Sequence, residues 1–178
     1  GEKDSEAESF IAGVLSKNRE ITDFLNPIVN SYERFGKFEA PKYISWSHQN
    51  RSQLIRIPAA TGEKTRMELR SPDSAINPYL AFSLILAAGV YGIENSLTLP
   101  KEINENLYIL GEEKLKDIEV LPESLQEALD IAKESEFIKS VIGSDVLNRY
   151  VELKQTEVDR YNKAIEKENI KRMYFEYI

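Results

Sequence analysis

The sequence contains no cysteine, a single histidine and no long apolar run, and each of these features excludes a class of function. Without cysteine there is no disulfide framework, no thiolate metal site and no cysteine nucleophile. No stretch reaches the roughly 18 consecutive apolar residues of a membrane-spanning helix, so we expect no membrane partner. A net charge of −7 and a pI near 5.0 lack the basic excess of a general nucleic-acid-binding protein. A cytoplasmic location is expected, because a cysteine-free chain suits a reducing compartment.

What remains is an ordinary globular composition, with 42% hydrophobic and 30% charged residues in 178 positions. This length predicts one domain with its own core. Apolar periodicity and breakers predict helices at 5–17, 18–25, 78–94, 122–135 and 144–165, a helical tail at 166–178, and strands at 43–46, 54–57 and 66–70. The expected fold class is α+β, with a small antiparallel sheet of about three strands within residues 43–70 followed by several packed helices.

The helix expected at 78–94 has the clearest start signal in the chain. Asn77 is suited to cap it and Pro78 to occupy its first position. Its side chains are apolar nearly all round, which predicts that it is the buried helix of the domain.

The segment Thr65–Arg70 combines a strand pattern with alternating charge. In a strand, Arg66, Glu68 and Arg70 share one face, opposite Thr65, Met67 and Leu69. Two guanidinium groups beside one carboxylate suit phosphate or carboxylate groups and a divalent cation. A solvated sheet face with alternating charges is the other interpretation of the same pattern.

Residues 30 to 70 are rich in arginine, with Arg34, Arg51, Arg56, Arg66 and Arg70. Such an excess within an acidic chain predicts a site for a multiply charged anion such as a nucleoside triphosphate. No glycine-rich phosphate loop is present, so side chains would hold the phosphates.

Two acidic residues complete this candidate site, although each also has a simpler interpretation. Glu68 is a candidate ligand for a divalent metal, and Glu39, in the long loop 28–41, is a candidate base. Arg34 and Arg51 could equally form surface ion pairs, and Glu39 could be solvated. His48 lies in a polar turn and is interpreted as a surface residue.

Several segments, in order, resemble the motifs of glutamine synthetases, nearest to the bacterial class I type. Residues 26–32 read N-P-I-V-N-S-Y, Arg34 follows, and residues 39–41 read E-A-P. The later matches are W-S-H-Q-N-R-S at 46–52, I-R-I-P at 55–58, T-R-M-E-L-R at 65–70 and N-P-Y-L-A at 77–81. The similarity covers nearly the whole chain.

The resemblance implies ATP-dependent ligation of ammonia to the γ-carboxyl of glutamate through γ-glutamyl phosphate, with Mg²⁺ or Mn²⁺ as cofactor. It assigns Arg34 and Arg70 to glutamate, and Arg51, Arg56 and Arg66 to ATP. Glu68 would be a metal ligand, and Glu39 and Arg51 would act in catalysis, Glu39 as a flap that helps to deprotonate ammonium. The stretch Phe35–Phe38 before Glu39 is one residue shorter than in the family and lacks its proline.

The resemblance also implies that residues 1–178 are one domain, the C-terminal portion of a catalytic domain whose first part and N-terminal β-grasp domain lie elsewhere. The parent would be a homododecamer of two hexameric rings, and the isolated chain should not turn over. A γ-glutamyl-polyamine ligase and a non-catalytic nucleotide-binding or regulatory relative remain alternatives. Tyr108 resembles a tyrosine that some enteric enzymes adenylylate, with a packing tyrosine as the alternative.

Overall fold

A computed structural model describes residues 2–37 and 39–163 of the chain, in which helices surround a small sheet. In order, the elements are α1 Glu2–Leu25, α2 Val29–Glu33, β1 Trp46–His48, β2 Ile55–Ile57, a 3-10 turn Gly62–Lys64, β3 Glu68–Leu69, α3 Pro78–Glu94, α4 Glu112–Leu115, α5 Leu125–Glu134, α6 Glu136–Ile142 and α7 Ser144–Lys163. The predicted α+β class is confirmed. The predicted helical tail at 166–178 lies outside the described residues.

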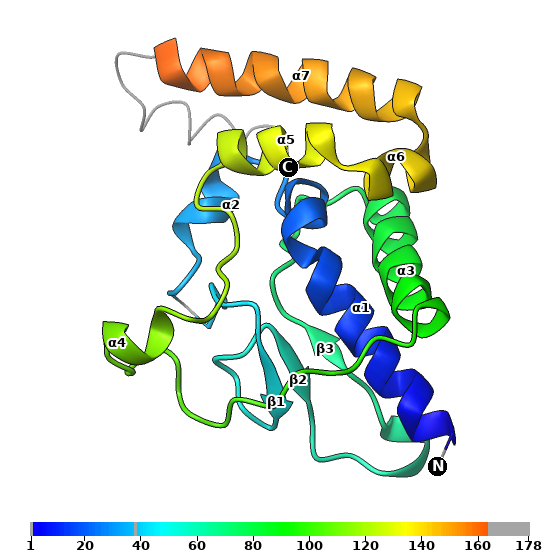
Figure 1. Cartoon of the computed structure of the whole chain (residues 1–178). Coiled ribbons are helices and arrows are strands. Elements are labelled where there is room, and N and C mark those ends of the chain that lie inside the picture. Colours follow the sequence, from blue (N-terminus) through cyan, green and yellow to red (C-terminus); the bar gives the residue numbers. More distant parts are fainter. Residues whose placement is uncertain (1, 38, 164–178) are drawn as a thin grey trace.

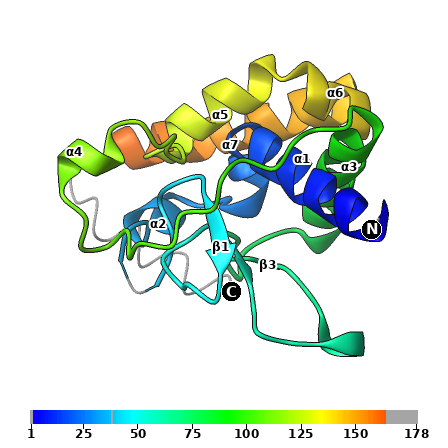
Figure 2. The same ribbon diagram turned by 60° about the horizontal axis from the view of Figure 1, so that its bottom comes forward.

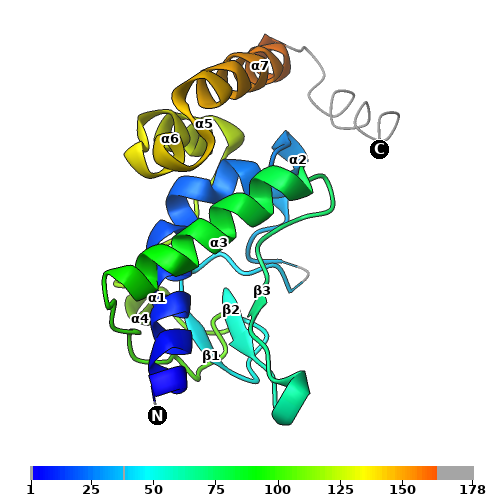
Figure 3. The same cartoon turned by 90° about the vertical axis from the view of Figure 1, so that its right-hand side faces the viewer.

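The helices are stacked in layers, with the sheet at one end of the stack (Figure 1). α1 and α3 lie side by side, α5 and α6 cross over their ends, and α7 packs on the outer side of α5, as Figures 1 and 3 both show. The connection between β2 and β3 projects away from the helices (Figure 2). The candidate site residues on β2 and β3 therefore lie at the end of the stack farthest from α7.

α1 is the central helix of the fold and runs as one element, although the sequence pattern predicts two shorter helices. The predicted boundary between Lys17 and Asn18 has no proline or glycine beside it. Asn18 is fully buried within the continuous helix. One core cluster joins α1 to α3, α5, α6 and α7 through Ile21, Phe24, Leu25, Ala81, Leu84, Ala132, Ile138 and Leu147. A second cluster joins α1 to the sheet through Ile11, Val14, Leu15, Leu54, Ile55, Ala88 and Leu121.

The sheet has the order β1-β2-β3 and is mixed. β1 and β2 are parallel, with Trp46 opposite Ile55, while β2 and β3 are antiparallel, with Arg56 opposite Glu68. The predicted antiparallel arrangement is therefore wrong for the first pair. Parallel pairs usually need a connection of about a dozen residues, but strands of three residues span only about 10 Å. The residues from Gln49, whose φ is 60°, to Leu54 can therefore return the chain to the start of β1.

α3 begins where the sequence predicts, because its cap is formed by local chemistry. The Asn77 side chain accepts hydrogen bonds from the backbone N–H groups of Tyr79 and Leu80 at 3.0 and 3.3 Å. Pro78 occupies the first turn, where its missing N–H costs nothing.

The prediction that α3 is buried on nearly all sides is wrong. The helix turns its small residues toward α1, where a Cβ added to Gly13 would lie 2.7 Å from the Gly92 backbone. The large apolar residues therefore point the other way, and Tyr79 and Phe82 are 83% and 60% exposed. In the described part of the chain no helix is long and apolar enough to cross a membrane.

Candidate functional site

β3 places Glu68 between two guanidinium groups. Arg56 lies opposite on β2 and donates to Glu68 Oε2 from Nε at 2.9 Å and from Nη2 at 2.5 Å. Arg66 donates from Nε to the other oxygen, Oε1, at 3.2 Å. Hydrogen bonds that favour the charged form, first those from Arg56, hold the pKa of Glu68 below its ordinary value. The structure thus brings three of the predicted site residues into one ion-paired cluster.

A second cluster surrounds Arg70, the residue directly after β3. The Arg70 side chain is 14% exposed, and it donates to the backbone carbonyls of Glu39, at 3.0 Å, and Arg51. The Glu39 carboxylate lies 3.8 Å from Arg70 Nη2 and 3.7 Å from Arg51 Nη1. Because the Glu39 and Arg51 side chains are 60% and 63% exposed, these long ion pairs add little stability. Both side chains remain open to solvent and to a ligand.

The loop that carries Glu39 is closed by its own backbone hydrogen bonds. The N–H of Gly36 donates to the Ala40 carbonyl, and the N–H of Ala40 donates to the Lys37 carbonyl, both at 2.8 Å. Glu39 has a φ of 60°, a left-handed conformation that costs a non-glycine residue roughly 1–2 kcal/mol. The hydrogen bond from Arg70 to the Glu39 carbonyl helps to hold the loop in this conformation.

Arg34 is turned away from these two clusters. Its Nη2 donates to Asn26 Oδ1 at 2.6 Å and to the Ser71 carbonyl. Its guanidinium also lies 5.3 Å from the centroid of the Phe35 ring. Burial lowers the pKa of Arg34 from its ordinary value, while the negative charge of Asp73 acts in the opposite direction. Here Arg34 ties the start of the Glu39 loop to the segment after β3, and its predicted role toward glutamate stays a prediction.

A set of polar contacts that the sequence pattern does not single out fixes the turn between β1 and β2. Asn50 Nδ2 donates to the carbonyls of Asn104 and Glu105 at 3.0 and 2.9 Å. Ser52 Oγ accepts the Leu107 N–H at 3.0 Å and donates to Asn50 Oδ1 at 2.8 Å. This turn carries Arg51, so the distant segment 104–107 positions one of the candidate arginines.

Tyr108 follows this anchored segment and lies near the Arg70 cluster. It is 39% exposed. Burial is the main reason that its pKa is raised, and the charges of Glu39 and Arg70 act on it in opposite directions. Its ring therefore borders the candidate site. Whether Tyr108 is modified, as the family resemblance suggests, stays a prediction.

A separate acidic group is buried where α1, α2 and α7 meet. Asp23 is fully buried, and neither of its carboxylate oxygens has a hydrogen-bond partner among residues 2–37 and 39–163. Burial raises its pKa from 3.8 to about 7, against the opposing effect of Lys154. The Tyr150 hydroxyl donates to the Asp23 backbone carbonyl at 3.2 Å. The groups around Asp23 belong to α1 and α7, at the end of the stack away from β2 and β3, so we relate this carboxyl to stability.

The described residues do not form a divalent-metal site by themselves. They contain no group of three His, Cys, Asp or Glu side chains that could hold an ion. Both oxygens of Glu68 are bonded to guanidinium groups. Mg²⁺ needs near-octahedral oxygen coordination, so Glu68 can supply at most one of several necessary ligands.

The chain is thus an α+β protein with a mixed sheet packed on helices, and four arginines and two glutamates lie on and beside its β2–β3 pair. Residues 2–173 match the family model described as "Glutamine synthetase, catalytic domain". The chain belongs to the glutamine synthetase family, which confirms the resemblance seen in its motifs.

Individual relatives agree with this assignment. The glutamine synthetase of Methanosarcina mazei is 46% identical over 163 residues, which are 90% of this chain and 36% of that protein. The Staphylococcus aureus glutamine synthetase is 43% identical over 162 residues, covering 89% and 36%. A solved GmaS/ADP complex has a TM-score of 0.79 at 29% identity, covering 92% of this chain and 38% of that one. Apo GmaS gives a TM-score of 0.79 at 30% identity. The chain thus spans just over a third of the length of these relatives.

Proposed function

We propose that this chain supplies part of the active site of an enzyme that ligates ammonia to glutamate using ATP. In this reaction an oxygen of the γ-carboxylate attacks the γ-phosphorus of ATP, and ADP leaves. Ammonia then attacks the carbonyl carbon of γ-glutamyl phosphate and displaces phosphate, which gives glutamine. The relatives named glutamine synthetase support this reaction class.

The observation that carries the proposal is the positive excess around the β2–β3 pair. Arg51, Arg56, Arg66 and Arg70 gather there with two glutamates, in a chain whose net charge is −7. Phosphoryl transfer depends mainly on positioning and on neutralising spread negative charge, which fixed guanidinium groups provide. A patch of this kind suits the phosphates of a nucleotide beside a substrate carboxylate.

The geometry suggests a division of work within the patch. Arg56 lies on β2 and Arg66 lies just before β3, and both would hold ATP phosphates, exchanging part of their bonding to Glu68 for phosphate oxygens. Arg51, on the anchored turn, would bind phosphate and act in catalysis. The solved GmaS structure that contains ADP supports a nucleotide on this fold.

The remaining assignments concern glutamate, ammonia and the metal ion. Arg70 would bind the glutamate carboxylate. Arg34 would also bind glutamate if its side chain turned outward from Asn26 and Ser71. Glu39 would close the site and accept a proton from ammonium, and its exposure lets it do so from the solvent side. Glu68 would contribute one ligand to Mg²⁺ or Mn²⁺, a cofactor whose chemistry is to neutralise phosphate charge. We propose a cytoplasmic location and a homododecameric parent from the family resemblance alone.

The proposal is tested in a full-length chimera, because the chain spans 36% of the Methanosarcina mazei protein. The matched segment of that enzyme is replaced by residues 1–178, and product formation is measured with ATP, glutamate and either ammonium or a polyamine. We expect glutamine, ADP and phosphate with ammonium only. A folded chimera that makes γ-glutamyl-polyamine would favour the polyamine ligase, and one that binds ADP without product would favour the non-catalytic alternative.

A further inference from the structure

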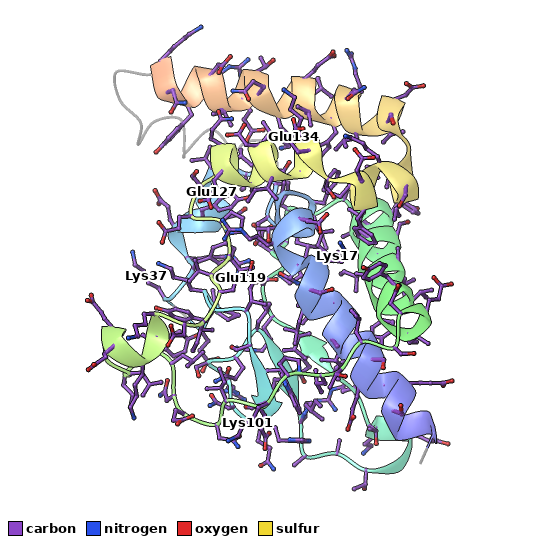
Figure 4. All side chains as sticks on the ribbon, in the orientation of Figure 1. Lys17, Lys37, Lys101, Glu119, Glu127 and Glu134 are labelled. Atoms are coloured by element: carbon purple, nitrogen blue, oxygen red, sulfur yellow. The ribbon has the colours of Figure 1, made fainter. Side chains whose placement is uncertain are left out.

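Residues 100–107 run along β1, the edge strand of the sheet, without forming a helix or strand themselves. The Trp46 Nε1–H donates to the Pro100 carbonyl at 2.7 Å, and the Ile103 N–H donates to the Trp46 carbonyl at 3.1 Å. Figures 1 and 2 both show this segment passing β1, and Lys101 on it is labelled beside the sheet in Figure 4. The 100–107 segment is thus fixed to the sheet before it reaches the turn that carries Arg51.

Gln53 joins that turn to the 100–107 segment from a fully buried position. Its Nε2 donates to the Glu105 carbonyl at 3.1 Å and to Ser52 Oγ at 3.4 Å. Its Oε1 is buried as well, but it accepts no hydrogen bond from residues 2–37 and 39–163.

Stability does not explain the buried amide of Gln53. A buried oxygen without a donor costs at least as much free energy as one buried hydrogen bond typically returns. An unbranched apolar side chain of similar length, such as that of methionine, would fill the same space without this cost. The amide therefore leaves the core no more stable than an apolar residue would, and its hydrogen bond to the Glu105 carbonyl needs another explanation.

Arg51 depends on this turn for its position, because its own side chain has only a weak partner. Its guanidinium is 63% exposed, and its ion pair with Glu39 is 3.7 Å long. Arg70 is held more firmly. It donates to the Glu39 carbonyl at 3.0 Å, and its backbone N–H donates to the Leu54 carbonyl at 2.9 Å. A small shift of the turn would therefore displace Arg51 more than Arg70.

We propose that Gln53 is a positioning residue for ATP, which acts by holding the turn against the 100–107 segment and so fixing the place of Arg51. This inference rests on the proposed function, in which Arg51 binds a phosphate of ATP. Gln53 cannot touch the nucleotide, since it is fully buried. A guanidinium that is already in place binds phosphate without a further loss of freedom on binding. The unpartnered Oε1 then reflects a stability cost that accompanies tighter ATP binding.

Gln53→Met tests the proposal in the chimera, because it removes the donor to Glu105 and keeps the shape of the side chain. We expect its KM for ATP to rise roughly fivefold, the change that corresponds to about one hydrogen bond, while its KM for glutamate stays unchanged. Its midpoint in urea unfolding should equal or exceed that of the parent. In hydrogen–deuterium exchange, the amides of residues 103–107 should exchange faster than in the parent.

Two further variants separate positioning from packing. Ser52→Ala breaks the same connection from the other side, because Ser52 Oγ accepts the Leu107 N–H at 3.0 Å. It should raise the KM for ATP as well, but with a lower urea midpoint, since the buried Leu107 N–H loses its acceptor. Asn18→Leu is the matched control, because Asn18 is also a fully buried amide with unpartnered atoms but lies on α1. It should leave both KM values unchanged.

The proposal would be overturned if Gln53→Met left the KM for ATP unchanged or raised both KM values equally. A Gln53→Met chimera less stable than the parent would assign Gln53 to the fold instead, and an equal kinetic effect of Asn18→Leu would do the same. If the unchanged chimera forms no glutamine, the proposed function fails. Exchange in residues 103–107 then decides the connection by itself: faster exchange in Gln53→Met supports it, and unchanged exchange overturns it.

Discussion

Replacing Asp23 by asparagine should change how the stability of this chain depends on pH. In the folded state burial raises the pKa of Asp23 from 3.8 to about 7. A carboxyl with a raised folded pKa binds its proton more tightly in the folded state than in the unfolded state. The folded state is therefore progressively destabilised as the pH rises from about 4 to about 7, and it stays so above that range.

The size of the effect follows from the shift. The folded and unfolded pKa values differ by about 3 units, and each unit corresponds to about 1.4 kcal/mol, which gives about 4 kcal/mol. The asparagine side chain in Asp23→Asn cannot ionise, so the variant does not lose this free energy of unfolding as the pH rises. The free energy of unfolding of the variant minus that of the parent should rise by about 4 kcal/mol from about pH 4 to about pH 8. A constant cost of burying the amide cancels from this change.

Other carboxyl groups do not imitate the effect. The pKa values of Glu68, Glu102 and Glu123 are lowered by their cationic or hydrogen-bonding partners. Their contributions are present above the ordinary carboxyl pKa and are lost only as the pH falls through the lowered values. They also occur in both proteins and cancel in the comparison.

Urea unfolding followed by circular dichroism, at five pH values from about 4 to about 8, measures this difference. Asp117→Asn removes an exposed carboxyl and serves as the control, whose difference should stay within about 0.5 kcal/mol. If the Asp23→Asn difference also stays constant with pH, Asp23 is hydrated or paired in solution, and the reasoning from burial is wrong.

The remaining predictions concern the site and the helix crossing. In the chimera, Glu68→Ala should abolish metal-dependent glutamine formation, and near-normal turnover would contradict its assignment as a metal ligand. Arg66→Ala should raise the KM for ATP at least tenfold more than the KM for glutamate, with Arg149→Ala on α7 unchanged as the control; the reverse split would mean that the two subsites are exchanged. The isolated 178-residue chain should form no glutamine at any Mg²⁺ concentration, and measurable turnover would show that it holds a complete site. Gly92→Ala should lower the free energy of unfolding by at least about 2 kcal/mol, because its Cβ would meet the backbone of α1, whereas Gly111→Ala meets nothing within 4 Å. Equal stabilities of these two glycine variants in urea unfolding would contradict the close crossing.

Features set by neighbouring residues could be predicted from the sequence, and features set by distant pairing could not. The start of α3 follows from Asn77 and Pro78, which act within one turn. The first strand is predicted at 43–46 but lies at Trp46–His48. Tyr43 instead pairs with Val120, far along the chain, and Trp46–His48 pairs with β2. The parallel direction of that pair depends on the path of residues 49–54, and no local pattern encodes this path.

The same distinction applies to the candidate site. Alternation along Thr65–Arg70 suffices to put Arg66 and Glu68 side by side, and the strand register adds Arg56. The inward turn of Arg34 could not be foreseen, because its acceptors, Asn26 and Ser71, come from different parts of the chain. The metal, nucleotide and substrate roles of the candidate site residues stay predictions until the chimera is assayed.

The central position of α1 has a consequence for synthesis of the protein. Part of its apolar face packs on α3, and that partner is synthesised only after the ribosome has added about 70 further residues, from Leu25 to Glu94. At about 5–20 residues per second this delay lasts roughly 4–14 seconds. During that time Asn18, Thr22 and Asp23, all fully buried in the finished fold, are hydrated and interrupt the apolar surface of the nascent helix. These polar groups thus make the nascent helix less prone to aggregate before its partners are made.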